Sequence, residues 1–564
     1  MINARDDYKA PLLVRDPGKA ISSESTMKEN SGSEGEILLD IDDQPRFLSS
    51  NGHHKYRDRD YKRSNGDGIE DDRINPFSAL GVSPGCVGTV CSIDPFRNHT
   101  PDIYGIYEWV KIVVLLPLVV VRLLAFVIVL SIGFVITKSA LAGWNDKHRP
   151  MPKWRCRLMW ATRFTARCIL FCWGFHWIRR IGKPASKAIA PIVVSNHVSY
   201  TDPIFFFYEL FPSIVTSETH DKIPFVGTII RAMQVIYVDR LSRKSRKHAV
   251  AEIKRKASCN DFPQVMLFPE GTTTNGRALI SFQLGAFIPG FPVQPVVVRY
   301  PHVHFDPSWG KISLLKLIFR MLTQIHNFME VEYLPVIFPI ESKMENPAFF
   351  AKKVGYSMAK VINVVQSEHS HGDLILATRA SQIGLVSPSS YLVEMAKMDR
   401  LFKLSIEDAV GFLEKFASMH PDSSGRVNID NFLAVLGMPR TSFSEQIFCF
   451  FDVEAQHSIT FTEFLYGSMS ILKQPKFPLV CEFAFKYCDI NGKGFLSKEE
   501  VERILELAFP CISQNNVYQI FKIFDLDGDE AVSWDDFKTC LERNPVFIAL
   551  FSALIGKDGF SCME

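Results

Sequence analysis

Hydrophobic and polar positions change pattern several times along the chain, and each change marks a predicted region. Residues 1–75 are rich in Ser, Gly and charged residues and have no sustained hydrophobic period, which predicts a disordered N-terminal tail. Residues 76–105 are rich in Pro and Gly and are expected to form a linker. Within the tail, residues 34–39 fit an acidic dileucine sorting pattern, although a chance apolar cluster explains so short a match better. The sequon that begins at Asn98 matters only if this stretch reaches a lumen.

The longest apolar run, residues 110–136, is long enough to cross a bilayer. Pro117 and Arg122 lie inside it, and an arginine in hydrocarbon is costly unless it reaches the surface or is buried in protein. The run therefore either spans the membrane or forms a broken re-entrant hairpin with both ends in the cytosol, and we favour the hairpin. The basic residues that crowd its far side indicate that this side is cytosolic.

A second apolar stretch, residues 168–178, is too short to span a bilayer by itself. Its aromatic residues and flanking arginines suit the bilayer interface, and a buried core helix is the alternative. Residues 106–184 are therefore predicted to be a membrane-associated region.

Residues 185–370 alternate between short apolar runs and helical segments, which predicts an α/β domain with helices on the faces of a sheet. The predicted strands are 192–194, 235–238, 265–268, 293–298 and 331–333. From about residue 400 to residue 545 the pattern changes to helix–loop–helix repeats with Phe-rich helices, which predicts an all-α EF-hand domain. The loops of these repeats are 420–431, 452–463, 489–500 and 525–536.

Composition narrows the function classes. At 564 residues the chain is expected to hold two or three domains. The formal net charge of +2 gives no reason to expect nucleic acid as a partner. The 12 scattered cysteines favour reduced thiols in a cytosol-facing protein, and the charged N-terminal residues leave no apolar core for a signal peptide.

The first chemical motif follows the predicted strand 192–194. This run ends in a polar turn that contains His197, and Asp202 follows five residues later. A neutral imidazole accepts a proton from a hydroxyl near pH 7, and a carboxylate on its second nitrogen fixes the tautomer and steadies the imidazolium. His197 and Asp202 are therefore predicted as a catalytic pair that needs no nucleophilic serine if the attacking hydroxyl belongs to the substrate. For this spacing alone, a capping aspartate beside an unrelated surface histidine is the alternative.

Three further motifs follow strands or bracket one. The strand 235–238 runs into Asp239 and Arg240, and the planar guanidinium of Arg240 suits phosphate recognition. The basic run 243–256 suits coenzyme A phosphates or anionic headgroups, or is a solvated helix face. In residues 265–274 the sequence Phe-Pro-Glu-Gly-Thr places a carboxylate and backbone amides in a turn that could orient a glycerol hydroxyl or hold a phosphate. Two prolines in residues 291–296 bracket a strand start and shape a pocket wall.

In this order and spacing the four motifs resemble those of the glycerolipid acyltransferases, over about residues 105–370. The resemblance implies that His197 is the general base on the acceptor hydroxyl and that Asp202 supports it. Gln234 departs from the pattern, because many members have glycine there, and this puts the local backbone in doubt. Backbone amides near Gly271 are expected to stabilise the tetrahedral intermediate, and no metal is needed for this step. The predicted substrate-binding residues are Gly227, Arg240, Glu270, Gly271, Thr272 and Thr273.

The EF-hand loops differ in how well they match a calcium site. Loop 525–536 has carboxylates at the first, third, fifth and twelfth places, but Glu530 stands where glycine is expected and the last carboxylate is a short aspartate. Loop 489–500 has the glycine and the terminal glutamate, but a lysine at the fifth place. The predicted metal positions are Asp489, Asn491, Lys493, Glu500, Asp525, Asp527, Asp529 and Asp536. We expect the last two loops to bind calcium and the first two to be structural remnants. A regulatory role for calcium is a hypothesis, and the alternative is a scaffold whose EF-hands pair without sensing calcium.

An acyltransferase domain followed by EF-hands resembles the EF-hand-containing lysophospholipid acyltransferases. Segments 285–290, 298–301 and 326–335 look closest to the plant lysophosphatidylethanolamine acyltransferases, whose animal relatives are lysophosphatidylcholine acyltransferases. The resemblance implies acyl-CoA as donor and lysophosphatidylethanolamine as preferred acceptor, with lysophosphatidylcholine and lysophosphatidylserine as secondary acceptors. It also implies an endoplasmic-reticulum membrane with both domains cytosolic, and possible Golgi or endosomal traffic. The alternatives are a calcium-responsive membrane scaffold with a vestigial acyltransferase fold, and an enzyme that acylates lysophosphatidic acid. No residue indicates an oligomeric state.

Overall fold

The structure is a computed structural model. It describes residues 75–82, 93–144, 149–223, 225–240, 242–310, 312–340 and 345–552. The expectations of a disordered tail and of a dileucine sorting signal concern residues outside this set.

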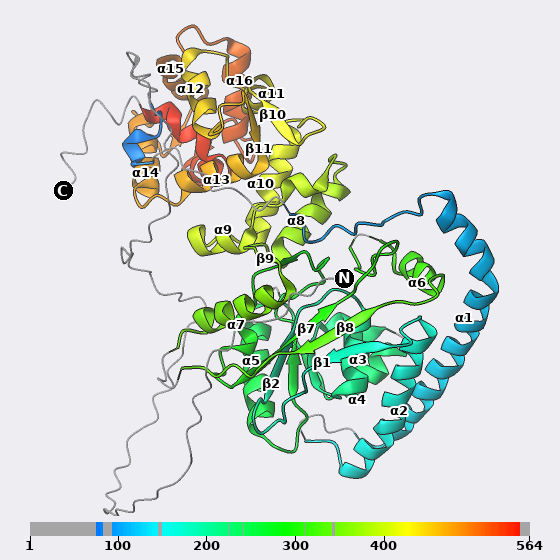
Figure 1. Cartoon of the computed structure of the whole chain (residues 1–564). Helices are drawn as coiled ribbons and strands as arrows, with labels where there is room; N and C mark the ends of the chain where they lie inside the picture. The colour runs from blue at the N-terminus through cyan, green and yellow to red at the C-terminus, as the bar shows by residue number, and fades with distance from the viewer. Residues whose placement is uncertain are drawn as a thin grey trace, which may run out of the picture. The chain divides into compact units, whose positions relative to one another are not determined.

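Two packed helices precede the sheet, α1 (Ile106–Leu141) and α2 (Lys153–Cys172) (Figure 1). The expected break at Pro117 is wrong, because α1 is one continuous helix of 36 residues that includes this proline. Arg122 is buried against protein, as its position in an apolar run requires. Its guanidinium donates to the main-chain carbonyls of Leu322, Gln324 and Ile325, at the end of α6 (Leu314–Leu322).

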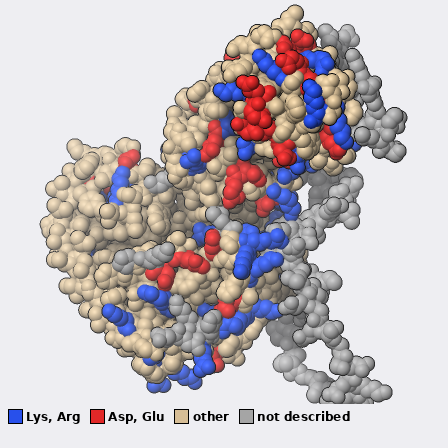
Figure 2. Space-filling model, turned by 180° about the vertical axis from the view of Figure 1, so that it is seen from behind, with Lys and Arg blue, Asp and Glu red and all other residues tan. Residues whose placement is uncertain are grey.

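The outer surface of α1 is apolar. Among the described residues, α1 is the helix that is long and apolar enough to cross a membrane. Figure 2, seen from behind, shows a broad surface with few charged residues on the side where α1 runs. The second apolar stretch divides between the two predicted roles, since Phe171 and Trp177 are exposed whereas Trp173 and Phe175 are buried.

A seven-stranded sheet forms the centre of the α/β domain, in the order β1-β8-β7-β2-β5-β3-β4. Neighbouring strands are parallel except β7 and β8, which are antiparallel. All five predicted strands are present, and β1 and β3 were not predicted. The strands are β1 (Ile178–Ile181), β2 (Ile192–Ser195), β3 (Ser213–Thr216), β4 (Ile236–Tyr237), β5 (Val265–Leu267), β7 (Val293–Arg299) and β8 (Met329–Tyr333).

Helices cover both faces of this sheet (Figure 1). In β2, Ile192 and Val194 pack in the core beneath α5 and α7, while Val193 packs in the core on the opposite face with α2 and α3. Burial on both faces explains the continuous apolar run and fixes the end of β2 in the middle of the sheet. The remaining elements of this part are α3 (Thr201–Glu209), η2 (Glu218–Lys222), α4 (Val226–Ala232), α5 (Arg243–Ser258), β6 (Ala278–Leu279), η3 (Leu284–Ala286), α7 (Pro347–Ile362) and β9 (Val365–Gln366).

The C-terminal part is helical and holds four EF-hand loops in two pairs. Short antiparallel strands join the loops of each pair, β10 with β11 and β12 with β13. The helices are α8 (His371–Gln382), η4 (Pro388–Tyr391), α9 (Met395–Phe402), α10 (Ile406–Ser418), α11 (Ile429–Leu436), α12 (Ser442–Phe451), α13 (Phe461–Leu472), α14 (Phe477–Cys488), α15 (Lys498–Ala508), α16 (Gln514–Phe524), α17 (Trp534–Arg543) and η5 (Pro545–Phe551). The strands are β10 (Arg426–Asn428), β11 (Ser458–Thr460), β12 (Phe495–Leu496) and β13 (Val532–Ser533).

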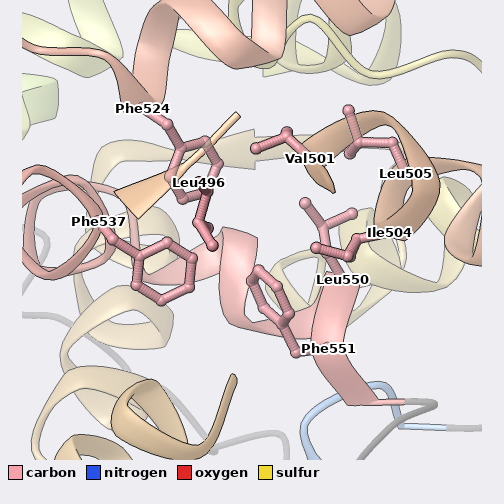
Figure 3. A pocket seen from close by; sticks show the side chains of 8 residues that line it. All are labelled: Leu496, Val501, Ile504, Leu505, Phe524, Phe537, Leu550 and Phe551. Carbon is pink, nitrogen blue, oxygen red and sulfur yellow. The ribbon is translucent and has the colours of Figure 1, made fainter. Parts of the chain in front are cut away.

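Segments from both ends of the described chain complete the EF-hand core. Phe77, beside the short helix η1 (Ser78–Leu80), is 1% exposed, and its ring centroid lies 4.6 Å from that of Phe450. At the other end, η5 places Leu550 and Phe551 against the last pair of hands, where they help to line a small apolar pocket (Figure 3). The other lining residues are Leu496, Val501, Ile504, Leu505, Phe524 and Phe537.

The described part of the expected linker makes specific contacts with the α/β domain. Asn98 is 2% exposed, and its Nδ2 donates to the carbonyls of Asp306 and Ser308. A glycan on this nitrogen is incompatible with those contacts, so the sequon at Asn98 is not a glycosylation site in this fold.

Candidate active site

The predicted motifs meet at the carboxyl edge of the parallel strands. His197 follows β2, Glu270 follows β5, and Arg240 follows β4, while His220 lies in η2 after β3. Because β2, β5, β3 and β4 are consecutive in the sheet, these four side chains succeed one another along one edge. Ligands of open α/β sheets bind at such an edge.

His197 and Asp202 form the predicted pair. His197 Nδ1 lies 2.9 Å from Asp202 Oδ2. The same oxygen accepts the backbone N–H groups of Val198 and Ser199, at 2.8 and 3.0 Å. The Asp202 side chain is 0% exposed whereas that of His197 is 18% exposed. The carboxylate therefore holds the imidazole by Nδ1, and Nε2 is the ring nitrogen left for a substrate proton.

The other oxygen of Asp202 has its own donor. The Tyr300 hydroxyl, which follows β7, donates to Asp202 Oδ1 and lies 2.6 Å from Thr201 Oγ1. Burial and the adjacent Asp202 carboxylate raise the pKa of Tyr300 well above its ordinary value, so the phenol stays protonated and remains a donor. Every oxygen of Asp202 is thus engaged, which fixes the carboxylate beneath the imidazole.

The backbone of His197 is fixed from the neighbouring strand. Its N–H donates to Glu270 Oε1 at 2.8 Å, and its carbonyl accepts the N–H of Thr274 at 2.8 Å. The imidazole stacks on the ring of Phe268, with centroids 4.1 Å apart. The third motif therefore holds the first motif in place.

Glu270 was predicted to contact the acceptor, and its burial does not allow that contact in this structure. Its side chain is 0% exposed. Burial raises the pKa of Glu270 to about 8, so the carboxyl is largely protonated at neutral pH. Oε1 accepts the His197 N–H, and Oε2 has no hydrogen-bond partner in the described chain. This arrangement suits positioning of His197.

The turn after Glu270 contains the other predicted residues of that motif. Gly271 has a φ of +71°, which glycine adopts without strain, and its N–H donates to the Phe268 carbonyl at 3.0 Å. That amide is therefore not free for the expected oxyanion contact. Thr272 is buried and Thr273 is half-buried, in the turn that follows Glu270. Their predicted substrate contacts remain predictions.

Gly227 and Gln234 have backbone roles in the second motif. A Cβ at Gly227 would lie 2.1 Å from the carbonyl oxygen of Asp221, so only glycine allows α4 to approach η2 here. The buried Gly227 offers no side chain to a substrate. Gln234 has a φ of +52°, in the left-handed region that glycine favours, so the backbone at this position is one that suits glycine. Its Oε1 accepts the N–H of Met151 at 3.0 Å.

Arg240 is exposed at the edge of the site. Burial, and next the charge of Arg240, lower the pKa of His220, and His197 contributes in the same direction. Burial and Arg240 also lower the pKa of His371 to about 4. The guanidinium therefore lies within electrostatic reach of His220 and His371, and His220 is in turn within reach of His197, which is a position that suits an incoming phosphate.

Sequence reasoning did not identify Asn196 and Tyr300. Asn196 exchanges two hydrogen bonds with the main chain of Val298, at 2.8 and 2.9 Å, and so ties the catalytic turn to β7. Asn196 is a polar residue directly before the candidate base, and this position was the available signal in the sequence. Tyr300 carried no local signal, because 98 residues separate it from Asp202.

The last EF-hand loop fits a calcium ion at three predicted positions. Carboxylate oxygens of Asp525, Asp527 and Asp529 lie within 4.8 Å of one another. Asp536 is not part of this group, and its Oδ2 accepts the N–H and the hydroxyl of Ser533. The carboxylate of Asp536 is therefore held at the start of its own helix, α17, and its predicted role as a calcium ligand remains a prediction.

The third loop fits in part. Asn491 Nδ2 donates to Glu500 Oε1 at 3.0 Å, so the third and twelfth positions meet. Both oxygens of Asp489 accept backbone N–H groups of the loop. Lys493 instead places its ammonium over the ring of Phe495, 5.9 Å from the centroid, and supplies no ligand.

Comparisons with known proteins agree with this organisation. The Acyltransferase family model matches residues 182–299, and the EF-hand domain pair model matches residues 480–541. Lysophospholipid acyltransferase LPEAT2 of Arabidopsis thaliana is 54% identical over 485 residues, which are 86% of this chain and 90% of that protein. Lysophosphatidylcholine acyltransferase 2 of Mus musculus is 32% identical over 78% of this chain and 81% of that protein. The crystal structure of the 1-acyl-sn-glycerophosphate (LPA) acyltransferase PlsC from Thermotoga maritima matches 45% of this chain and 96% of that one, with a TM-score of 0.34 and 17% identity.

Proposed function

The chain belongs to the lysophospholipid acyltransferases of the glycerolipid acyltransferase family, and on this premise we propose that it moves an acyl group from acyl-CoA to the free hydroxyl of a lysophospholipid. The preferred acceptor in this proposal is lysophosphatidylethanolamine, with lysophosphatidylcholine and lysophosphatidylserine as secondary acceptors. The observation that carries it is the partly exposed imidazole of His197 held through Nδ1 by the buried Asp202.

The proposed reaction needs only these side chains and the two substrates. His197 Nε2 takes the proton of the acceptor hydroxyl, and the oxygen of that hydroxyl attacks the thioester carbonyl carbon. The new C–O bond forms, the C–S bond breaks, and the imidazolium returns its proton to the departing thiolate of coenzyme A. Asp202 keeps the imidazole in the tautomer that starts each cycle and stabilises the imidazolium.

Basic side chains at the edge of the sheet support phosphate-bearing substrates. Arg240 is exposed beside the start of α5, whose first turns expose Arg243, Lys244 and Lys247. We assign Arg240 to the phosphate of the lysophospholipid and the α5 residues to the phosphates of coenzyme A. Replacing Arg240 with Ala should raise the KM for the lysophospholipid more than it lowers kcat.

Membrane attachment through α1 and α2 is the proposed way to reach lipid substrates. The apolar outer surface of α1 supports insertion into one leaflet. Arg122, near the middle of α1, binds carbonyls of the α/β domain, so a perpendicular crossing would carry that loop into hydrocarbon. We therefore propose that both ends of α1 lie on the cytosolic side, at the endoplasmic reticulum with possible Golgi or endosomal traffic. Tags before residue 93 and at the C-terminus should both be digested by protease added to sealed microsomes.

Calcium is proposed to bind the last two EF-hand loops. The gathered carboxylates of Asp525, Asp527 and Asp529 support this for the fourth loop, and Asp489, Asn491 and Glu500 would serve in the third. Bound calcium would supply a positive charge that neutralises these loops. Whether acyl transfer responds to it is tested by adding calcium or a chelator to the assay below.

The test of the proposal is acyl transfer by membranes that contain the wild type, His197→Ala or His248→Ala. His248 is an exposed histidine on α5 and serves as the matched control. With one acyl-CoA and a panel of lysophospholipids, His197→Ala should lose about 10²–10⁴-fold in turnover and His248→Ala should not. Turnover that favours lysophosphatidic acid would contradict the acceptor proposed. A well-folded wild type without turnover would favour a scaffold.

A further inference from the structure

The second EF-hand loop, residues 452–463, has an arginine side chain among its cation ligands. Calcium in an EF-hand is bound by side chains at positions one, three, five and twelve and by the main-chain carbonyl at position seven. In this loop the third, seventh and twelfth positions are Glu454, Ser458 and Glu463. The guanidinium of Arg426, from the first loop, reaches all three.

The contacts of Arg426 follow the pattern of a bound cation. Its NH2 nitrogen lies 3.5 Å from Glu454 Oε2, 3.8 Å from Glu463 Oε2 and 3.3 Å from the Ser458 carbonyl oxygen. Its Nε donates to Ser458 Oγ at 2.9 Å. The side chain of Arg426 is 20% exposed, that of Glu463 is 4% exposed and that of Glu454 is 59% exposed, so the contact with Glu463 is the one that lies away from solvent. Buried charges of opposite sign need such pairing.

The pairing of the loops explains why position 426 reaches this site. In the first pair, β10 and β11 place Arg426 opposite Thr460, the ninth residue of the second loop. In the second pair, β12 and β13 place Phe495 opposite Ser533, the ninth residue of the fourth loop. The two positions are therefore equivalent. Where the arginine is replaced by Phe495, the three aspartates of the fourth loop gather without a guanidinium among them.

We propose that the guanidinium of Arg426 takes the place of calcium in the second EF-hand loop and keeps the first pair of hands closed without metal. The calcium that an EF-hand implies does not fit this loop while the guanidinium lies among its ligands. Any calcium response of the chain then belongs to the second pair alone.

The test is calcium stoichiometry of the purified full-length protein, measured by equilibrium dialysis at millimolar free calcium. Arg426→Phe copies the residue of the second pair, and Arg426→Ala removes the charge with less bulk. Either variant should bind one more calcium per chain than the wild type. Each should also unfold at a lower temperature in chelator, and calcium should restore the loss. The matched control is Arg440→Ala, an exposed arginine of the same pair that binds Asp430 and Glu445, both outside the second loop.

Two results would overturn the proposal. The first is a folded Arg426 variant that binds no more calcium than the wild type, with a stability loss that calcium does not reverse. The second uses Glu463→Gln in the wild-type background, which keeps the test open if the arginine variants fail to fold. The proposal expects no change in calcium stoichiometry on this substitution. Loss of one bound calcium would mean that the second loop already binds the metal.

Discussion

At the scale of single residues, the proposed reaction depends most on the orientation of the Asp202 carboxylate. Its Oδ2 serves His197 and two backbone amides, and its Oδ1 accepts the Tyr300 hydroxyl. Tyr300→Phe removes the hydroxyl that donates to Asp202 Oδ1 while it keeps the ring in the core. A hydrogen bond to a charged group contributes about 1.5–3 kcal/mol. We expect kcat to fall by about 10- to 100-fold with little change in the KM for either substrate, measured by steady-state kinetics.

Tyr333 offers a matched control for this substitution. It is also a buried tyrosine on the neighbouring strand, β8, but its hydroxyl has no hydrogen-bond partner in the described chain. Tyr333→Phe should therefore leave kcat unchanged. Equal losses in the two variants would mean that Tyr300 acts through packing and not through Asp202.

The buried Glu270 predicts an unusual dependence of stability on pH. Its pKa is raised by burial to about 8 in the folded protein, above its ordinary value, so folding favours the protonated form. This contribution is fully present below about pH 4.5 and is lost as pH rises through 8. Glu270→Gln copies the protonated form and keeps an oxygen for the His197 N–H. The free energy of unfolding, measured by chemical denaturation, should therefore differ between Glu270→Gln and the wild type in a pH-dependent way. The difference in favour of the variant should be several kcal/mol larger at pH 8.5 than at pH 5.

The same variant separates charge from positioning in the reaction. Because Glu270→Gln retains the acceptor for His197, it should keep most of the wild-type turnover at pH 7, whereas Glu270→Ala should lose it. A Gln variant as inactive as the Ala variant would show that the negative charge itself is required.

How far these residues could be predicted depends on whether their partners are local. His197 and Asp202 lie five residues apart, so one turn of chain brings them together and the spacing is enough to predict the pair. Glu270 was recognised by its motif, but its role as a buried support depends on β2 and β5 being neighbours, which spacing does not fix. Tyr300 reaches Asp202 only through the order of β7 and β2 in the sheet. Long-range partners of this kind need the fold.

At the scale of elements, hydrophobic pattern identified the central strands and missed two outside them. β2, β5 and β7 are buried on both faces and read as continuous apolar runs. β1 reads Ile-Arg-Arg-Ile and lies at the sheet edge, where exposed positions carry charge. β3 is short and begins and ends with hydroxyl residues. The unbroken α1 was missed because Pro117 was given more weight than the apolar surroundings, in which neighbouring helices compensate for a proline.

Arg122 makes α1 a part of the α/β domain, and this can be tested. Its guanidinium donates to the main-chain carbonyls of Leu322, Gln324 and Ile325, at and just after the end of α6. The last carbonyls of a helix have no partner within the helix, so they need donors from elsewhere. Arg122→Met leaves those acceptors unpaired and should destabilise the detergent-solubilised protein by about 2–4 kcal/mol. Val121→Ala, at an adjacent and exposed position, is the control and should change little. Equal melting temperatures for the two variants would contradict this role.

At the scale of the whole molecule, one hydrophobic core is built from segments that are far apart in the sequence. The sequence predicted a linker at residues 76–105, an α/β domain and a separate EF-hand domain. In the structure, Phe77, Leu80 and Val82 belong to the EF-hand core although α1, α2 and the α/β domain intervene in sequence. No local pattern announces this, because three apolar residues in a Pro- and Gly-rich stretch have no period. At the other end, η5 fills the second pair of hands with Leu550 and Phe551 (Figure 3).

This shared core predicts that the EF-hand helices are not self-sufficient. Phe77 is 1% exposed and packs on Phe450, so Phe77→Ala removes a buried aromatic ring and should destabilise the EF-hand domain by about 3–5 kcal/mol. Ser78→Ala, at an exposed position of η1, is the control. The readout is hydrogen exchange of the full-length protein, which should rise in α12 and α13 in the Phe77 variant and stay unchanged around His197. Unchanged exchange in α12 would contradict this prediction, because it would mean that the EF-hand core closes without Phe77.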